Sequence, residues 1–293
     1  MKHLLLILFF APFLAFAQRD WSQVEVKNNP VEGNISFLTG AGGNIGVLHG
    51  PEGIMIIDDQ FAPLSDKISE TIGSFAEGDL KFVLNTHYHG DHTGGNENFK
   101  TGGATIVGHD NVRSRMQVDF DDAVLKRTVK AKTESFWPVI TFSSDMTFYF
   151  NDEEVQLVHV ASAHTDGDAL IHFKTSNVIH AGDAFVRYGY PFIDVAGGGS
   201  IDGIIDAQKK ILELSDENTK IIPGHGALAS IAEVKELLQM LEETRSIIFN
   251  AKSSGKQLED LIAEKPFADY HERWNGNFIS SDLFVQLIYE SLP

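Results

Sequence analysis

The amino-acid sequence predicts a mixed α/β fold in which two β-sheets pack face to face and helices cover their outer sides. Strand-like apolar runs precede helical patterns in two similar halves of the chain, which is the order expected of such a sandwich. The 293 residues are 43% hydrophobic and 22% charged, which is typical of a globular protein with a large core. The sequence contains no internal repeat and no low-complexity linker, so residues 18–293 are expected to form a single domain.

The first half of the chain is expected to consist of short strands separated by turns. Short apolar runs bounded by glycine or aspartate predict the strands. A helix is predicted over residues 63–75, where Leu64, Ile68 and Ile72 recur at helical spacing. The strands of this half are predicted at 35–39, 45–48, 54–57, 81–86 and 104–107.

The second half begins after a mixed segment, residues 111–132, which is expected to be partly helical. Strand composition returns over 139–150, and helical spacing dominates toward the C-terminus. The last part of the chain, about 251–293, is expected to be a C-terminal helical extension of the domain. The further strands are predicted at 155–160, 169–173, 178–180 and 220–222, and the helices at 201–214, 231–249, 257–263 and 282–292.

The N-terminus has the pattern of a secretory signal peptide over residues 1–17. Lys2 and His3 form a short polar start, an apolar stretch follows, and Ala15-Phe16-Ala17 fits an A-x-A cleavage site. We therefore expect a periplasmic or secreted protein with no stable membrane anchor. The alternative is an uncleaved anchor, which the shortness of the apolar stretch disfavours.

Charge and cysteine content exclude several classes of protein. The chain has 23 basic and 41 acidic residues, a net charge of −18, which disfavours binding to nucleic acid or to an anionic membrane surface. It contains no cysteine, so disulfides, a lipoprotein anchor, thiol catalysis and thiolate metal ligands are excluded. A small-molecule substrate is the expected partner, and the sequence leaves the oligomeric state open.

The strongest functional signal is the segment His87-Tyr88-His89-Gly90-Asp91-His92, which follows an apolar strand. Imidazole nitrogen and carboxylate oxygen are the ligands that zinc takes when no thiolate is present. A tight loop at a strand end can aim His87 and His89 at one ion, while Asp91 and His92 face a second ion nearby. A lone His-x-His is commonly a surface pair, but this concentration of ligands favours a metal site.

Three further candidate ligands lie in later turns that contain glycine. His164 is in the segment AHTDGD, Asp183 in HAGD and His225 in PGHG. Taken singly, such residues are more often structural, but a closed dinuclear site needs all three together. The other histidines have no such support and are expected to be surface or core residues: His49, His109, His159, His172, His180 and His271. A second set follows the Asp183 turn and either lines the pocket or is structural: Arg187, Tyr188 and Tyr190.

These seven candidate ligands, in this order, resemble the ligand set of the metallo-β-lactamase superfamily. The H-x-H-x-D-H motif is specific, and the similarity extends from about residue 35 to residue 241. The resemblance implies a four-layer αββα sandwich. It also implies that Asp183 bridges two zinc ions, of which one is bound by His87, His89 and His164 and the other by Asp91, His92 and His225.

The bridging position distinguishes branches of this superfamily. Its secreted β-lactamases typically have cysteine or serine at this position. An aspartate, as at Asp183 in this chain, resembles the glyoxalase II, lactonase and ribonuclease Z branches. Asp58, at the end of an early strand, matches an aspartate of the family and would brace the His87 loop.

The resemblance implies an exported zinc-dependent hydrolase in which a metal-bridging hydroxide cleaves a small ester, lactone, thioester or amide. Asp91 would be the catalytic residue that orients the hydroxide and passes a proton to the leaving atom. The cofactor would be two Zn²⁺ per chain, with iron or manganese as alternatives. One alternative function is a metallo-β-lactamase acting on β-lactam antibiotics. Another is a di-iron redox protein of the same fold, although no flavin-carrying domain is visible in the sequence.

Overall fold

The computed structural model describes residues 20–122, 126–276 and 278–293. The predicted signal peptide, residues 1–17, lies outside the described residues. Among the helices of the described ranges, none combines the length and the apolar character that crossing a lipid bilayer requires.

Seven strands form the larger sheet: β1 (Lys27–Glu32), β2 (Ile35–Thr39), β3 (Ile45–Gly50), β4 (Gly53–Ile57), β5 (Leu80–Leu84), β6 (Thr105–His109) and β9 (Ile140–Phe142). They are hydrogen-bonded in this same order. The strands from β1 to β4 are antiparallel neighbours, whereas β4, β5, β6 and β9 run parallel. Parallel neighbours need crossover connections, which here contain the helices on the outer face of the sheet.

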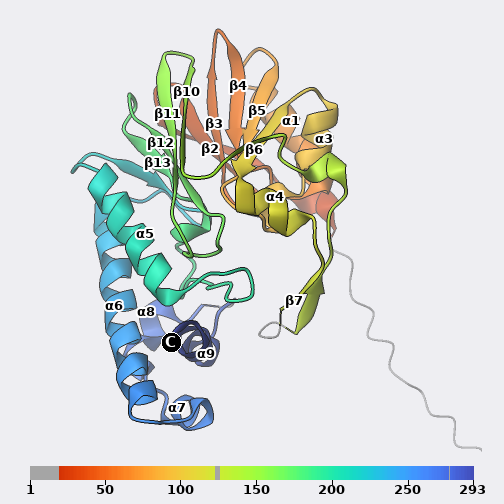
Figure 1. Ribbon diagram of the computed structural model, residues 1–293. Coiled ribbons are helices and arrows are strands. Elements are labelled where there is room, and N and C mark those ends of the chain that lie inside the picture. The colour runs from red at the N-terminus through yellow and green to blue at the C-terminus, as the bar shows by residue number, and fades with distance from the viewer. Residues whose placement is uncertain (1–19, 123–125, 277) are drawn as a thin grey trace, which may run out of the picture.

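Five strands form the smaller sheet: β10 (Asp145–Phe150), β11 (Glu153–His159), β12 (Ala169–Phe173), β13 (Val178–His180) and β14 (Lys220–Ile222). The strands from β10 to β13 are antiparallel neighbours, and β14 pairs in parallel with β13. A separate hairpin of β7 (Phe120–Asp122) and β8 (Arg127–Val129) projects from the body of the molecule (Figure 1).

Helices cover the outer face of each sheet. α1 (Ser65–Gly73) and α3 (Asn96–Thr101) lie against the larger sheet, and α5 (Ile201–Leu214) and α6 (Ile231–Ser253) lie against the smaller one (Figure 1). The shorter helices are α2 (Gly90–Thr93), α4 (Asp110–Met116), α7 (Leu258–Glu264), α8 (His271–Trp274) and α9 (Ser281–Ser291). Single 3-10 turns are η1 (Trp21–Gln23), η2 (Ala62–Leu64), η3 (Glu134–Phe136), η4 (Gly182–Ala184) and η5 (Ala268–Tyr270).

Three apolar layers hold these elements together. Alternate residues of the strands, such as Met55 and Ile57 of β4 and Leu157 of β11, are buried between the two sheets. A second layer joins the larger sheet to Ile68 of α1, and a third joins the smaller sheet to α5, α6 and α9. The molecule is therefore an α/β/β/α sandwich, which confirms the predicted fold class.

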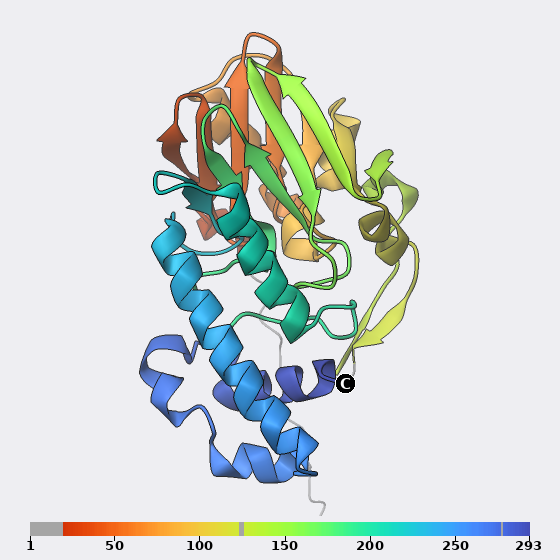
Figure 2. The ribbon, with the colours of Figure 1, turned by 60° about the vertical axis from the view of Figure 1, so that its left-hand side comes forward.

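The C-terminal helices belong to the third layer. Phe284, Leu287 and Ile288 of α9 are 0% exposed and pack in the same apolar cluster as α5 and α6. The C-terminal helices lie at the end of the sandwich toward which the β7–β8 hairpin also projects (Figure 2).

The structure changes three of the predicted elements. The helix predicted over 63–75 is divided, because η2 ends at Leu64 and α1 begins at Ser65. The segment 111–132 is helical only as far as Met116, and β7 and β8 follow in polar sequence that carries little strand signal. The strand predicted at 81–86 ends at Leu84, which leaves Asn85 and Thr86 in the loop that follows.

The strand β1 was not predicted either. β1 contains Asn28, Asn29 and Pro30, residues that are depleted in central strands. It lies at the edge of the larger sheet, where proline and exposed polar residues are tolerated.

Candidate metal centre

The seven predicted ligands, called the ligand cluster below, follow strand ends of both sheets. The loop after β5 carries four of them, and the loops after β11, β13 and β14 carry one each: His87, His89, Asp91 and His92, then His164, Asp183 and His225. The larger sheet therefore supplies the first four residues and the smaller sheet the last three. The fold brings all seven together where the two sheets meet.

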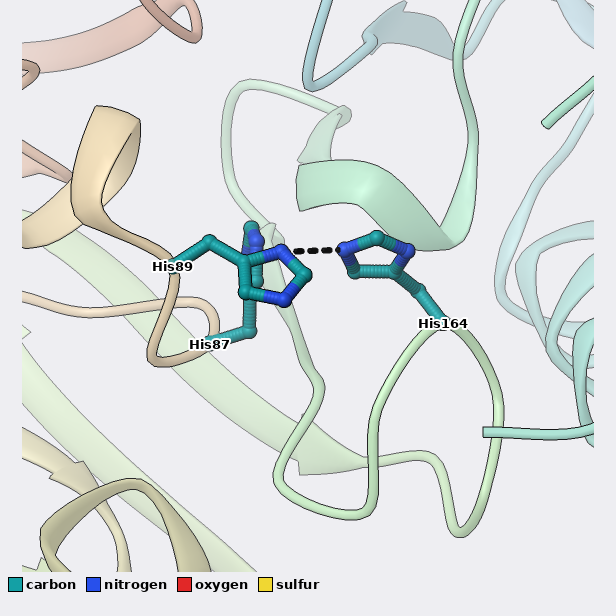
Figure 3. A group of neighbouring side chains, drawn as sticks. All are labelled: His87, His89 and His164. Atoms are coloured by element: carbon teal, nitrogen blue, oxygen red, sulfur yellow. Dashed lines mark hydrogen bonds between the residues drawn. The ribbon is translucent and has the colours of Figure 1, made fainter. Parts of the chain in front are cut away.

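His87, His89 and His164 converge on one point (Figure 3). One nitrogen of each ring lies within 4.8 Å of a nitrogen of the other two. The dashed line in Figure 3 marks one of these separations, in which Nδ1 of His89 is 2.9 Å from Nε2 of His164. His87 and His164 are buried, with exposed fractions of 0% and 1%.

Hydrogen bonds on the outer side of two rings fix which nitrogen faces this point. Nδ1 of His164 donates to the carbonyl oxygen of Phe192 at 2.8 Å. Nε2 of His89 donates to the carboxylate of Asp194 at 2.7 Å. Because the outer nitrogens carry the protons, the inner nitrogens present lone pairs, as metal ligation requires.

Asp58 orients two more histidines in the same way. Its carboxylate accepts hydrogen bonds from Nδ1 of His92 and from the backbone N–H and Oγ1 of Thr86, each at 2.7 Å. Oγ1 of Thr86 in turn accepts from Nδ1 of His87 at 3.0 Å. These contacts leave Nε2 of His87 and Nε2 of His92 on the sides of the rings that face the cluster, where each can serve as a metal ligand.

Asp91, His92 and His225 form a second group, whose donor atoms also lie within 4.8 Å of one another. Nε2 of His225 is 3.2 Å from Oδ2 of Asp91 and 3.2 Å from Nε2 of His92. The side chains of Asp91 and His225 are 32% and 24% exposed, so this group borders solvent, whereas His92 is fully buried.

Asp183 lies between the two groups. Its Oδ1 is 3.2 Å from Nε2 of His92, and its Oδ2 is 3.5 Å from Nε2 of His225 and 3.7 Å from Nε2 of His164. Gly224 approaches so closely that a Cβ at this position would overlap the Asp183 carboxylate. Glycine before His225 is therefore a requirement of the site.

The donor set is compatible with the binding of divalent cations. Nε2 of His87 and Oδ1 of Asp183 are buried and form no hydrogen bond within the described residues, although buried polar atoms normally have a partner. Nδ1 of His89 and Nε2 of His164 present lone pairs to each other across 2.9 Å, a repulsion that a shared cation would remove. Imidazole and carboxylate donors suit zinc, and they also accept iron or manganese.

Burial and neighbouring charges set the protonation states of the cluster. Burial lowers the pKa of His87 well below its usual value and lowers the pKa of His164 to about 4, so both rings are neutral near neutral pH. Burial opposes ionisation of Asp183, but the charges of His225 and His92 hold the pKa of its carboxyl well below the usual value. Neutral imidazole and ionised carboxylate are the forms in which these groups bind metal.

Asp194 is a site residue that the sequence did not reveal. It is 2% exposed and accepts hydrogen bonds from Nε2 of His89, from the Tyr88 hydroxyl and from the N–H of Gly197. It is 105 residues from His89 along the chain, so no local spacing connects them. The only sequence signal is an acidic residue directly after the apolar pair Phe192-Ile193.

A cavity of about 880 Å³ opens over the cluster, a size that suits a small organic molecule. Four members of the cluster line it: His89, Asp91, Asp183 and His225. Aromatic and cationic side chains form much of its wall: Tyr88, Tyr188, Phe192, Phe278, Arg115, Lys130 and Lys132.

The three residues after the Asp183 turn have different roles. Tyr188 lines the cavity, and the centre of its ring is 5.6 Å from that of His225. Tyr190 is fully buried and stacks on Phe284 at 4.5 Å, and Arg187 donates hydrogen bonds to two carbonyl oxygens of the loop after β14. Of these three residues, only Tyr188 therefore faces the pocket.

The sequence model of the metallo-beta-lactamase superfamily matches residues 38–225, a range that contains the whole ligand cluster. The chain belongs to this superfamily. The match confirms the resemblance seen in the sequence, and members of the superfamily are mostly hydrolases. No curated protein sequence matches this superfamily member.

Several solved structures share the fold of this superfamily member. A metallo-beta-lactamase from Pontibacter korlensis has a TM-score of 0.60 and 14% identity, covering 74% of this chain and 99% of its own. The DIM-1 metallo-beta-lactamase has a TM-score of 0.61 and 17% identity, covering 75% and 99%. A double mutant of the sec-alkyl sulfatase PisA1 has a TM-score of 0.70 and 13% identity, covering 90% of this chain and 50% of its own. At such identities the likeness shows the fold alone.

Proposed function

We propose that this protein is an exported dinuclear zinc hydrolase that cleaves a small ester, lactone, thioester or amide. The proposal is carried by one observation, the two ligand groups that meet at Asp183 beneath the cavity. Zinc bound there would polarise a carbonyl oxygen and lower the pKa of a water molecule toward neutrality. The first ion would be held by His87, His89 and His164, and the second by Asp91, His92 and His225.

Asp91 is the residue of this chain that is placed to move protons. Its carboxylate borders the cavity and lies 3.2 Å from Nε2 of His225. Burial opposes ionisation, but the charge of His92 and the hydrogen bond from His225 hold the pKa of the Asp91 carboxyl well below its usual value. An ionised carboxylate at this place would accept a proton from the attacking water and deliver it to the leaving atom.

The proposed enzyme acts outside the cytoplasm, in the periplasm or as a secreted protein. The A-x-A sequence at Ala15-Phe16-Ala17 supports removal of residues 1–17 during export. A net charge of −18 disfavours nucleic acid as a partner. The cavity of about 880 Å³ over the ligand cluster supports a small-molecule substrate.

Replacement of Asp91 by asparagine tests the catalytic role. We expect Asp91→Asn to fold normally and to lose most of its turnover, by about 100-fold or more, because the amide cannot accept and deliver the proton. The matched control is Asp206→Asn, an exposed residue of α5 that loses the same charge away from the cavity. Full activity of Asp91→Asn at normal zinc content would reject the role.

A substrate panel tests the reaction class. Lactones, thioesters, simple esters and the β-lactam nitrocefin are offered to one zinc-quantified preparation of the mature chain. Cleavage of any of the first three supports the proposal, whereas cleavage of nitrocefin alone would identify a β-lactamase. Iron in place of zinc, together with visible colour and no hydrolysis, would favour the redox alternative.

A further inference from the structure

We propose that the substrate carries a negatively charged group, such as a carboxylate, that Lys132 binds while an apolar part of the substrate covers Phe278. This inference rests on the proposed hydrolytic function of the same site and narrows its substrate class. It follows from the distribution of charge and apolar surface over the walls of the cavity.

The charged part of the cavity wall is cationic. Within the described part of the chain, the carboxylates that line the cavity are Asp91 and Asp183, and both belong to the ligand cluster. The other charged side chains, apart from the histidines, are Arg115, Lys130 and Lys132. In a chain with 41 acidic and 23 basic residues, three cations that line one cavity do not follow from composition. Such a wall favours an anionic ligand.

Two of these cations already have a carboxylate partner. Nη2 of Arg115 is 2.6 Å from Oδ2 of Asp166, and Nε of Arg115 donates to the same carboxylate. Nζ of Lys130 is 2.7 Å from Oδ2 of Asp119. Neither aspartate lines the cavity, so these pairs leave little unbalanced charge on its wall.

Lys132 is different, because it forms no ion pair with any described residue. Its ammonium group lies 5.3 Å from the centre of the Phe136 ring, a contact that attracts a cation without neutralising it. Its backbone is held on both sides, since its N–H donates to Met116 at 2.7 Å and its carbonyl accepts from Nε1 of Trp137 at 3.0 Å. The backbone of Lys132 is therefore already fixed beside the cavity, and only its side chain has to be ordered when it binds an anion.

The C-terminal segment supplies an apolar wall. Phe278 lines the cavity and is 59% exposed, so most of its apolar surface is open to a ligand. The centre of its ring is 5.9 Å from that of Tyr188 and 5.9 Å from that of Phe192, and both of these also line the cavity. A hydrocarbon segment of the substrate would remove this aromatic surface from water.

The two walls define an amphipathic monoanion as the favoured substrate. Lys130 and Lys132 follow β8 of the hairpin, which projects toward the end of the molecule where the C-terminal helices lie (Figures 1 and 2), whereas Arg115 lies on α4. The ligand cluster forms the part of the cavity to which the scissile carbonyl would bind. A substrate with its reactive carbonyl, a short apolar chain and a terminal carboxylate can meet all three surfaces together.

A matched pair of esters tests this inference. The probes are the monophenyl ester of adipic acid, which ends in a carboxylate, and the same ester ending in a neutral carboxamide. Both release phenol on cleavage and have nearly the same size. We expect kcat/KM to be roughly tenfold higher for the carboxylate, the ratio that corresponds to ~1.4 kcal/mol. The ratio should fall as salt is added, because part of it is electrostatic.

Variants identify the residue responsible for the preference. Lys132→Met is expected to reduce the carboxylate-to-carboxamide ratio to about twofold or less, and Lys132→Arg to keep most of it. Lys235→Met, on the exposed side of α6, removes the same charge far from the cavity and controls for net charge. Phe278→Ala is expected to raise KM for both esters and to leave their ratio intact. A merely structural effect of Lys132 would lower both rates and leave the ratio unchanged.

Binding of uncleavable analogues separates this inference from the proposed function. Phenoxyhexanoate and phenoxyhexanamide contain an ether in place of the ester, and their affinities for the zinc-loaded protein are measured by calorimetry. If the wild-type protein prefers the carboxylate analogue and Lys132→Met does not, the inference is supported. This holds even if neither ester is cleaved, because absence of cleavage would count only against the proposed hydrolase function. Equal affinity of the two analogues for the wild-type protein, or a preference unchanged in Lys132→Met, would overturn the inference.

Discussion

Asp58 is the residue through which two histidines of the ligand cluster are held in place. It contacts His92 directly and His87 through Thr86. Its φ of 63° lies in the left-handed region, which aspartate tolerates better than most residues. Because Asp58 is completely buried, these donors and not solvent satisfy its carboxylate oxygens.

Replacement of Asp58 by asparagine is therefore expected to weaken metal binding. The amide keeps the size and the tolerance of positive φ, but it loses the charge that favours the hydrogen bond from His92. We expect zinc affinity to fall by about 10- to 100-fold, the usual effect of losing such a partner. Competition with a chromophoric chelator measures it, with Asp206→Asn as the control. Unchanged affinity would show that Asp58 serves the backbone turn only.

At the residue scale, sequence reasoning worked where contacts are local. His87, His89, Asp91 and His92 could be proposed together because they share one loop, and the structure brings them together. The grouping with the later ligands came only from the family resemblance, because no spacing rule connects loops from different sheets. Asp194 shows the limit most clearly, since its contact with His89 depends entirely on tertiary packing.

α6 shows how an element far from the cavity is fixed by its first turn. Oγ of Ser230 accepts from the N–H of Ala232 at 3.2 Å, and the Glu233 side chain accepts from the N–H of Ser230 at 2.9 Å. This capping box satisfies N–H groups that the helix itself cannot pair. The helix then buries Val234, Leu237 and other apolar residues against the smaller sheet.

Loss of this cap should lower stability without touching the metal site. Ser230→Ala is expected to reduce the free energy of unfolding by about 1 kcal/mol. For a domain of this size that corresponds to a fall of roughly 2–4 °C in Tm. Ser230→Thr keeps the hydroxyl and serves as the control, and thermal unfolding followed by circular dichroism measures both. If the alanine variant melts at the wild-type temperature, the capping box contributes nothing measurable.

At the element scale, the sequence was informative where local signals and burial agree. The bounds of α5 were predicted correctly, because Ser200 caps the helix and its isoleucines recur on one buried face. The β7–β8 hairpin was missed because its residues, Phe120–Asp122 and Arg127–Val129, show no alternation of apolar and polar side chains. β1 was missed because its partner strand, and not its composition, makes it a strand.

The C-terminal helices are tied to the rest of the molecule by their apolar faces. Four neighbouring side chains of α9 are at most 1% exposed: Phe284, Val285, Leu287 and Ile288. Burial of a large apolar side chain contributes about 1.5–3 kcal/mol, and a whole domain is stable by only about 5–15 kcal/mol. The stability of the sandwich therefore depends on this segment.

A chain that ends at residue 250 is expected to be insoluble or unfolded, as judged by soluble yield and circular dichroism. Leu287→Ala in the full chain is the milder test, and we expect it to cost about 2–5 kcal/mol in urea unfolding. Glu290→Ala, an exposed residue of the same helix, is the control. A stable, folded chain of residues 20–250 would show that the helical extension is dispensable.

Each half of the predicted dinuclear site takes ligands from both sheets: His87 and His89 meet His164, and Asp91 and His92 meet His225. Ions bound there would fasten the two halves of the sandwich to each other. The chain has no cysteine with which to form a covalent cross-link. The cations that take part in catalysis would then also cross-link the two sheets. During refolding, metal uptake would be complete only when the two halves of the sandwich have docked.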